Sequence, residues 1–208
     1  MSARADHAVI ASLIESGARV LDVGCGDGAL LSLLARERRV DGRGLELSQA
    51  GVNACVARGL SVVQGDAERD LAFFPDQCFD YAVLSRTLQS VLAPKSVLGE
   101  LQRVSRRVVV SFSNYGHWRA RFGLLTSGRM PGSPALGAAW HDRERVHPCT
   151  VRDFVRLAAE LELKVERAVP ISHGEAGAPF AQVLWRANWF AEDVVFLLHA
   201  REAHLRAA

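Results

Sequence analysis

The sequence has almost no lysine, no close pair of cysteines and no long apolar run. Of its 25 basic residues only Lys95 and Lys164 are lysines, and 23 acidic residues leave a formal charge of +2, which indicates no nucleic-acid partner. The four cysteines lie far apart, which excludes closely spaced zinc motifs and the disulfide frameworks of small secreted proteins. No stretch approaches the roughly 20 apolar residues that span a bilayer.

The opening residues, 1–7, contain no apolar segment that could act as a signal peptide. We therefore expect a cytoplasmic protein with reduced thiols and without a membrane partner. Its 208 residues are 49% hydrophobic and 23% charged, which is the composition of a folded globular chain. That length predicts a single domain over residues 1–208.

The first two thirds of the sequence alternate short β-rich runs with helical patterns. Strands are expected at Arg19–Val23, Gly42–Glu46, Ser61–Gly65, Phe79–Leu84 and Arg107–Phe112. Helices are expected at Ala29–Arg38, Gln49–Arg58 and Pro94–Val104. This alternation predicts an α/β fold, a doubly wound, Rossmann-like and mostly parallel sheet.

An irregular, basic and aromatic insertion, residues 113–149, follows the fifth expected strand and shows no sustained period. A connection of this length in a compact domain usually carries function. After it we expect, in order, a helix near Val151–Glu160, strands at Lys164–Pro170 and Phe180–Arg186, and a last helix from Ala191 to His204.

A glycine-rich loop with Gly24, Gly26 and Gly28 leaves the first strand and opens the first helix. A dinucleotide would lay its pyrophosphate here, beside the carboxylates of Asp22 and Asp27. Each like-charge contact at 4 Å costs about 4 kcal/mol at an effective dielectric near 20. S-adenosylmethionine carries a sulfonium and an ammonium group instead, so the acids favour it over NAD.

Two further acids follow the next two strands. Glu46 ends the second strand, where a carboxylate can accept both ribose hydroxyls, and Asp66 follows the third, where it can accept the adenine amino group. The carboxyl ends of parallel strands share one edge of a sheet, the edge at which open α/β sheets bind ligands.

The runs Val20–Gly28, Glu46 and Gly65–Ala67 resemble the class I S-adenosylmethionine-dependent methyltransferases. A closer resemblance, to the methionine-biosynthesis MetW family, lies in Val83–Gln89, Ser111–Arg119, Ser127–Pro131 and His147–Phe154. It implies S-adenosylmethionine or S-adenosylhomocysteine as cofactor. The cofactor-binding residues it implies are Asp22, Gly24, Gly26, Gly28, Glu46, Leu47, Asp66, Ala67 and Ser85. Arg86 stands where Gln is expected in that family.

The same resemblance implies a function in the first committed step of methionine synthesis, the acylation of homoserine, as the partner of a homoserine O-acyltransferase of the α/β-hydrolase type. The chain has no G-x-S-x-G nucleophile elbow, so it is not expected to transfer the acyl group itself. Two alternatives stay open. One is an active methyltransferase on a small molecule. The other is a NAD-type oxidoreductase, which the acids Asp22 and Asp27 disfavour.

The insertion is the expected docking region for that partner, through Asn114, Trp118, Arg121 and Phe122, because interface centres are rich in aromatic residues and arginine. It could instead be a lid over the cofactor or simple packing under a long loop. Its histidines, His117, His141 and His147, have spacings that fit no metal site. We therefore assign no metal ligand and no catalytic residue.

Overall fold

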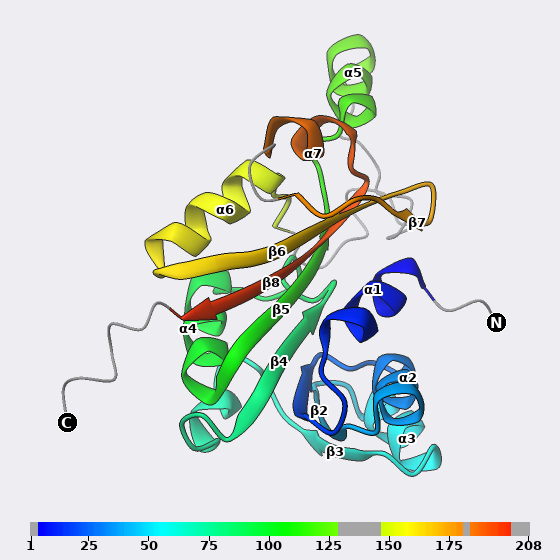
Figure 1. The fold of residues 1–208 in the computed structure, drawn as a ribbon, viewed down its shortest axis with the longest axis vertical. Helices are drawn as coiled ribbons and strands as arrows, with labels where there is room; N and C mark the ends of the chain where they lie inside the picture. The colour runs from blue at the N-terminus through cyan, green and yellow to red at the C-terminus, as the bar shows by residue number, and fades with distance from the viewer. Residues whose placement is uncertain (1–3, 129–146, 181–183, 201–208) are drawn as a thin grey trace.

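The fold is built on one twisted sheet with helices on both faces. A computed structural model describes residues 4–128, 147–180 and 184–200 (Figure 1). Within these residues the sheet has eight strands in the order β3-β2-β1-β4-β5-β8-β6-β7. The strands are β1 (Arg19–Val23), β2 (Asp41–Glu46), β3 (Ser61–Gln64), β4 (Phe79–Ser85), β5 (Ser105–Ser113), β6 (Leu163–Ser172), β7 (Glu175–Ala176) and β8 (Asp193–Ala200).

Strands β1 to β5 run parallel to one another, whereas β8 runs antiparallel to both β5 and β6. The helical elements are α1 (Ala5–Leu13), α2 (Ala29–Arg38), α3 (Gln49–Ala57), η1 (Asp70–Phe73), α4 (Pro94–Val104), α5 (Trp118–Ser127), α6 (Val151–Glu160) and α7 (Leu184–Phe190). None of them, in the part of the chain described, is long and apolar enough to cross a membrane. The mostly parallel α/β sheet predicted from the sequence is confirmed.

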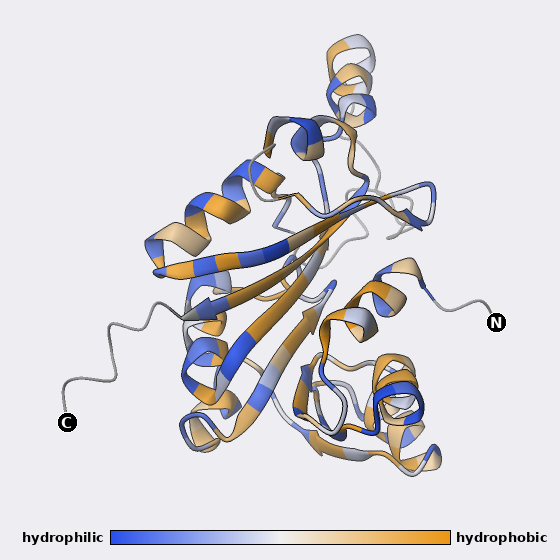
Figure 2. Ribbon diagram, in the orientation of Figure 1, coloured by the Kyte–Doolittle hydropathy of each residue, from blue (hydrophilic) through white to orange (hydrophobic). Residues whose placement is uncertain are grey.

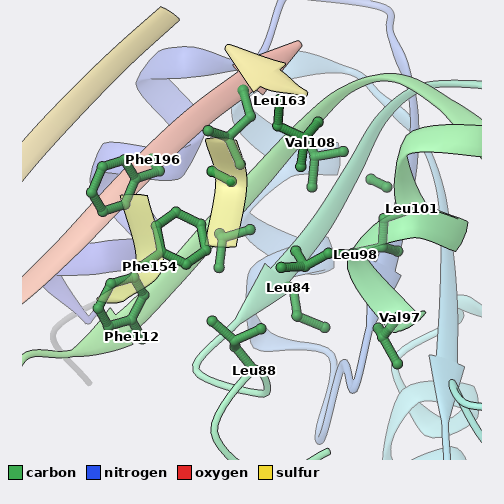
Figure 3. Packing of buried hydrophobic residues seen from close by; sticks show 14 of the residues in the cluster. Leu84, Leu88, Val97, Leu98, Leu101, Val108, Phe112, Phe154, Leu163 and Phe196 are labelled. Atoms are coloured by element: carbon green, nitrogen blue, oxygen red, sulfur yellow. The ribbon is translucent and has the colours of Figure 1, made fainter. Parts of the chain in front are cut away.

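Successive residues of the central strands pack into two separate cores, because side chains alternate between the faces of a strand. Val108 and Val110 of β5 join α4 and α6 on one face, and Val109 joins α1 and α2 on the other. On the first face the rings of Phe112, Phe154 and Phe196 lie together (Figure 3). The strands are therefore apolar on both faces, as Figure 2 shows for β4, β5 and β8.

The helix expected near Val151–Glu160 and the strand expected at Lys164–Pro170 are present as α6 and β6, whereas the last two predicted elements were wrong. The residues expected as a helix, Ala191–His204, form β8 from Asp193, and those beyond 200 lie outside the described residues. Of the expected strand Phe180–Arg186, residues 181–183 lie outside the described residues, and α7 begins at Leu184. The run 194–198 is buried throughout, and a continuous apolar run carries no periodicity that separates a buried strand from a buried helix.

The helix α1 was not predicted from the sequence. It packs on α2, β6 and β8, and buries Val9, Ile10 and Leu13 in the second core. Its first turn carries Asp6, whose side chain is fully buried and points to the ends of β4 and β5. This helix therefore brings the start of the described chain to the edge of the sheet that the sequence marks as the site.

Candidate functional site

The loop after β1 adopts a conformation that needs glycine. Gly24, Gly26 and Gly28 have φ values of 71°, 57° and 75°, in the left-handed region. A Cβ at Gly24 would lie 2.6 Å from the Thr87 side chain, and one at Gly28 would lie 2.4 Å from Leu60. Nothing lies within 4 Å of the corresponding position at Gly26. The outer turn of the loop is thus bare backbone that a ligand can approach.

Glu46 ties the end of β2 to this loop. Its Oε2 accepts a hydrogen bond from the backbone N–H of Gly26, and Oε1 accepts one from Ser48, both at 2.9 Å. The side chain is nearly buried, yet each carboxylate oxygen retains a lone pair for a further donor. Glu46 thus joins the end of β2 to the glycine loop, a contact that the sequence did not predict.

Asp66 follows β3 in a tight local turn. Its Oδ1 accepts the backbone N–H of Glu68 at 2.9 Å, and its own N–H donates to Asp70 Oδ2 at 2.7 Å. Arg69 Nε lies 3.4 Å from Asp66 Oδ2 on the exposed side. The carboxylate is thus oriented before any ligand arrives.

A cavity of about 310 Å³ lies between these elements. Five of the residues predicted for the site line it together: Gly24, Glu46, Leu47, Asp66 and Ala67. The segment after β4 forms the rest of the wall with Arg86, Thr87, Ser90, Val91 and Leu92. The structure therefore brings the acids after β2 and β3 to one hollow, with a wall from β4 that the sequence reasoning did not assign.

The two acids of the glycine loop lie in different surroundings. Asp27 is exposed, and its Oδ2 lies 2.7 Å from Arg58 Nη2, so its charge is compensated at the surface. Asp22 is buried, and within the described residues its Oδ1 has no hydrogen-bond partner. Burial raises the pKa of Asp22 to about 7, with Arg4 lowering it and Glu46 raising it further. Asp22 is thus a buried acid with an unpaired oxygen within the described residues, and it does not itself line the cavity.

Ser85 does not line the cavity. Its Oγ donates to Asp6 Oδ2 at 3.2 Å and lies 3.3 Å from Arg4 Nη2 and 3.4 Å from Ser111 Oγ. The next residue, Arg86, has a φ of 57° and lines the cavity instead. Sequence reasoning treated Arg86 only as a departure from a family pattern. Arg86 comes directly after a buried strand, at the same edge of the sheet as the acids, and this position could have indicated that it belongs to the site.

A larger hollow of about 660 Å³ lies at the opposite edge of the sheet, near the starts of β1, β4 and β5. Its charged side chains already pair with one another. Arg107 lies 3.0 Å from Glu15 and 3.3 Å from Glu166, and it also contacts the Tyr81 hydroxyl at 3.0 Å. This hollow is remote from the glycine loop, and its size does not make it the functional site.

The helix α5 stands apart from the sheet and buries none of its residues (Figure 1). Its apolar side chains Trp118, Phe122 and Leu125 are 41%, 59% and 82% exposed. On the neighbouring α7, Trp185, Trp189 and Phe190 are also exposed, and Arg121 stacks over the Trp189 ring at 4.5 Å. We call these six apolar residues the α5–α7 surface.

Asn114 does not belong to that surface, because its side chain is buried. Its Nδ2 donates to the backbone oxygens of Ala187, Asn188 and Ala191 at 2.9–3.2 Å. Its Oδ1 accepts from the N–H groups of Gly116 and Val151. The expectation that Asn114 contacts a partner is corrected: its side chain joins the base of α5 to α6 and α7.

Neither described histidine of the insertion, His117 or His147, lines the cavity. His117 caps α5, where its Nδ1 accepts the Arg119 N–H at 3.3 Å, and burial lowers its pKa. His141 lies outside the described residues. The backbone of His147 donates to the Gln89 oxygen at 2.7 Å, next to Ser90 of the cavity. The C-terminal end of the insertion, at His147, therefore lies beside the cavity, whereas no residue of α5 lines the cavity.

The strand order, the glycine loop after β1 and the acids after β2 and β3 define a class I S-adenosylmethionine-dependent methyltransferase-like fold. A Thermotoga maritima S-adenosylmethionine-dependent methyltransferase, a possible histamine N-methyltransferase, superposes with a TM-score of 0.68 at 14% identity, covering 94% of this chain and 87% of that one. The putative methyltransferase in a complex with the Haloferax volcanii Trm112 activator also gives 0.68, at 17% identity over 97% and 91%. These likenesses show the fold alone.

The model of the family described as methionine biosynthesis protein MetW matches residues 4–198, and the chain belongs to that family. The bifunctional methionine biosynthesis protein MetXA/MetW of Rhodopirellula baltica is 32% identical over 173 residues, which are 79% of this chain. The chain spans only 28% of that relative's length. Membership in the family supports a role in methionine biosynthesis.

Proposed function

We propose that the protein binds S-adenosylmethionine or S-adenosylhomocysteine and acts as the non-nucleophilic partner of a homoserine O-acyltransferase of the α/β-hydrolase type. The observation that carries the proposal is the bifunctional relative, in which a MetW part shares one polypeptide with a part named MetXA. Fusion of two activities in one chain supports their association where they are separate. The missing nucleophile elbow agrees with a partner rather than an acyltransferase.

The residues present fit an adenosyl ligand. Glu46 would accept the ribose hydroxyls with the lone pairs that Gly26 and Ser48 leave free, and Asp66 would accept the adenine amino group. Within the part of the chain that the structure describes, Oδ1 of the buried Asp22 has no hydrogen-bond partner, and this oxygen suits the ligand's ammonium group. NAD would instead place its anionic pyrophosphate beside the same acid.

Replacement of Glu46 tests the cofactor half of the proposal. We expect Glu46→Ala to weaken binding of S-adenosylhomocysteine by about 1.5–3 kcal/mol, because charge-assisted hydrogen bonds to the ribose are lost. Isothermal titration measures the affinity. Asp41→Ala changes an exposed acid at the other end of the same strand and should leave the affinity unchanged. Equal losses in the two variants would contradict the ribose assignment.

The α5–α7 surface supports the partner half. Six large apolar side chains would remain in water on two short helices, whereas aromatic anchors of this kind carry most of the energy of protein interfaces. Arg119, Arg121 and Arg186 lie over the rings of Trp118, Trp189 and Trp185. We infer that the acyltransferase offers an apolar groove with an acidic rim to these helices.

The alternative function, methyl transfer to a small molecule, is favoured by the cavity itself. When bound, S-adenosylmethionine would supply an electrophilic methyl group. A general base within hydrogen-bond reach of the acceptor is a common further requirement. Among the described residues, the titratable groups that line the cavity are Glu46, Asp66, Glu68 and Arg86, and none of them is a histidine.

An activity assay with the purified proteins distinguishes the two functions. Alone, the protein should form no O-acylhomoserine. Added to the homoserine O-acyltransferase of the same host, it should raise the rate of acyl transfer. Labelled methyl groups that pass from S-adenosylmethionine to a metabolite with repeated turnover, together with no effect on the acyltransferase, would reverse the order of the two proposals.

A further inference from the structure

We propose that Cys25 and Cys55 form an oxidative modification site, at which a peroxide links the two thiols in a reversible disulfide that weakens binding of the adenosyl ligand. Cys25 belongs to the glycine loop after β1, and Cys55 lies in the last turn of α3. Their sulfur atoms are 3.7 Å apart. The effect on the ligand rests on the proposed cofactor, whereas formation of the disulfide does not.

The two sulfur atoms occupy space that neighbouring glycines leave open. A Cβ at Gly44 would lie 2.6 Å from Cys25 Sγ, and a Cβ at Gly28 would lie 2.9 Å from Cys55 Sγ. Apolar side chains enclose the pair in a small core of its own, separate from the two cores of the sheet. A disulfide bond is about 2.05 Å long, so the sulfur atoms need to approach each other by roughly 1.7 Å.

The other two cysteines have different surroundings. Cys78 Sγ lies 3.8 Å from the backbone oxygen of Val104, and Cys149 Sγ lies 3.7 Å from Gln89 Nε2. All four cysteines lie within the described residues, and all four are free thiols. Among the contacts given for them there, the one between Cys25 and Cys55 joins two sulfur atoms.

Burial protects the pair from brief exposure to an oxidant. It raises the pKa of both thiols, so few thiolates are present at neutral pH and a peroxide reacts slowly. Cys55 is completely buried, whereas Cys25 is 8% exposed and precedes Gly26, where the backbone of the loop is bare. Cys25 is therefore the sulfur that an oxidant reaches first.

A peroxide supplies the oxidising power for the step. The Cys25 thiolate attacks one peroxide oxygen, the O–O bond breaks, and the sulfur becomes a sulfenic acid while the other oxygen takes up a proton and leaves as water. The Cys55 sulfur then attacks the sulfenic sulfur, and the OH group leaves as a second water with the Cys55 thiol proton. The two sulfurs lose two electrons, which the peroxide gains. A dithiol reverses the reaction and is itself oxidised to a disulfide.

The disulfide would act on the part of the loop that contacts the acid assigned to the ribose. Cys55 Sγ donates to the Gly26 backbone oxygen at 3.4 Å, and the Gly26 N–H donates to Glu46 Oε2 at 2.9 Å. The new bond removes this S–H donor and draws Cys25 toward α3. Because binding groups need to be held within about 0.5 Å of their productive positions, the shift should weaken the adenosyl ligand.

Peroxide treatment of the folded wild-type chain tests the proposal. After hydrogen peroxide, blocking of free thiols and digestion, we expect mass spectrometry to find the Cys25 peptide linked to the Cys55 peptide, and dithiothreitol to remove the linkage. Isothermal titration should show that the oxidised protein binds S-adenosylhomocysteine at least about tenfold more weakly than the reduced protein does. Reduction should restore the affinity.

Two variants locate the response. Cys55→Ala removes the second sulfur of the pair, so its affinity should be the same before and after peroxide. Cys149→Ala removes a partly buried thiol that contacts Gln89 instead of a second sulfur, so it should lose affinity on oxidation as the wild-type protein does.

Each result of these measurements decides one question. Absence of the Cys25–Cys55 linkage after peroxide would overturn the proposal, and so would a linkage that leaves the affinity unchanged. Failure of the reduced wild-type protein to bind any adenosyl ligand would refute the proposed cofactor instead, and mass spectrometry would still establish whether the disulfide forms. The wild-type measurements decide both questions even if Cys55→Ala fails to fold.

Discussion

The carboxyl group of Asp22 shows how a single residue of the site can oppose stability. An ordinary aspartate titrates near pH 3.8, whereas burial raises the pKa of Asp22 to about 7 in the folded protein. The folded state therefore holds this proton more firmly than the unfolded state does. Its contribution to stability is complete below about pH 4 and is lost as the pH rises through 7. The loss amounts to about 4 kcal/mol.

Substitution of Asp22 should remove this dependence on pH. We expect Asp22→Asn to increase the free energy of unfolding of the ligand-free protein by about 3 kcal/mol more at pH 8 than at pH 5. Urea unfolding at the two pH values measures the difference. Asp41→Asn alters an exposed acid and should show no such difference. If Asp22→Asn has the same effect at both pH values, Asp22 is ionised throughout that range.

At the scale of elements, α5 is separated from the cores. None of its residues is buried, so truncation of its apolar side chains leaves packing intact. We expect Trp118→Ala and Phe122→Ala each to weaken association with the acyltransferase by more than about 1 kcal/mol, and to change the free energy of unfolding by less than about 0.5 kcal/mol. Titration of the partner and urea unfolding measure the two effects.

A matched control for these variants is Phe73→Ala, which removes an 84% exposed phenylalanine from η1. It should change neither association nor stability. A lid would behave differently from a docking surface, because Trp118→Ala would then weaken the adenosyl ligand and leave association intact. A fall in melting temperature of several degrees on Trp118→Ala would instead indicate that the ring is packed.

Asn114 is the opposite case, a buried side chain that holds α5, α6 and α7 together. Asn114→Ala would leave three carbonyl oxygens and two N–H groups without this partner. We expect a loss of stability of at least about 2 kcal/mol, since each buried unpaired group costs about 1–3 kcal/mol. Thermal unfolding measures it. Unchanged stability would show that these groups find other partners, such as water.

The elements that the sequence predicted correctly differ in the signal that revealed them. Helix α4 has the clearest period, with Val97, Leu98, Leu101 and Val104 on its buried face, whereas β2 contains one apolar residue and was placed by its position between two helices. The sequence did not predict α7 followed by β8. Val194–Leu198 is buried on both faces of the sheet, so apolar and polar residues do not alternate along it. The acids Glu46 and Asp66 were found by their place at strand ends. The Ser85 side chain points to Asp6, which lies 79 residues away in the sequence. A local sequence pattern therefore could not reveal this contact.

At the scale of the whole molecule, binding of the cofactor shifts the folding equilibrium toward the folded state by mass action. A ligand that binds only the folded state raises the melting temperature as its concentration rises. We expect S-adenosylhomocysteine at 100 times its Kd to stabilise the protein by about 2.7 kcal/mol, and NAD at the same concentration to have little effect. Differential scanning fluorimetry measures both. Stabilisation by NAD alone would mean that the acids of the loop were misinterpreted.

The position of β8 has a consequence for synthesis of the chain. It follows every other strand of the sheet in sequence, yet it lies between β5 and β6 and pairs with both. While the ribosome has made only the residues before Asp193, the edge of β5 has no neighbour, and β6 has no place in the sheet. Open edges of this kind pair readily with other chains. Within the described sheet, the outer edge of β5 therefore gains its partner only when β8 has been synthesised.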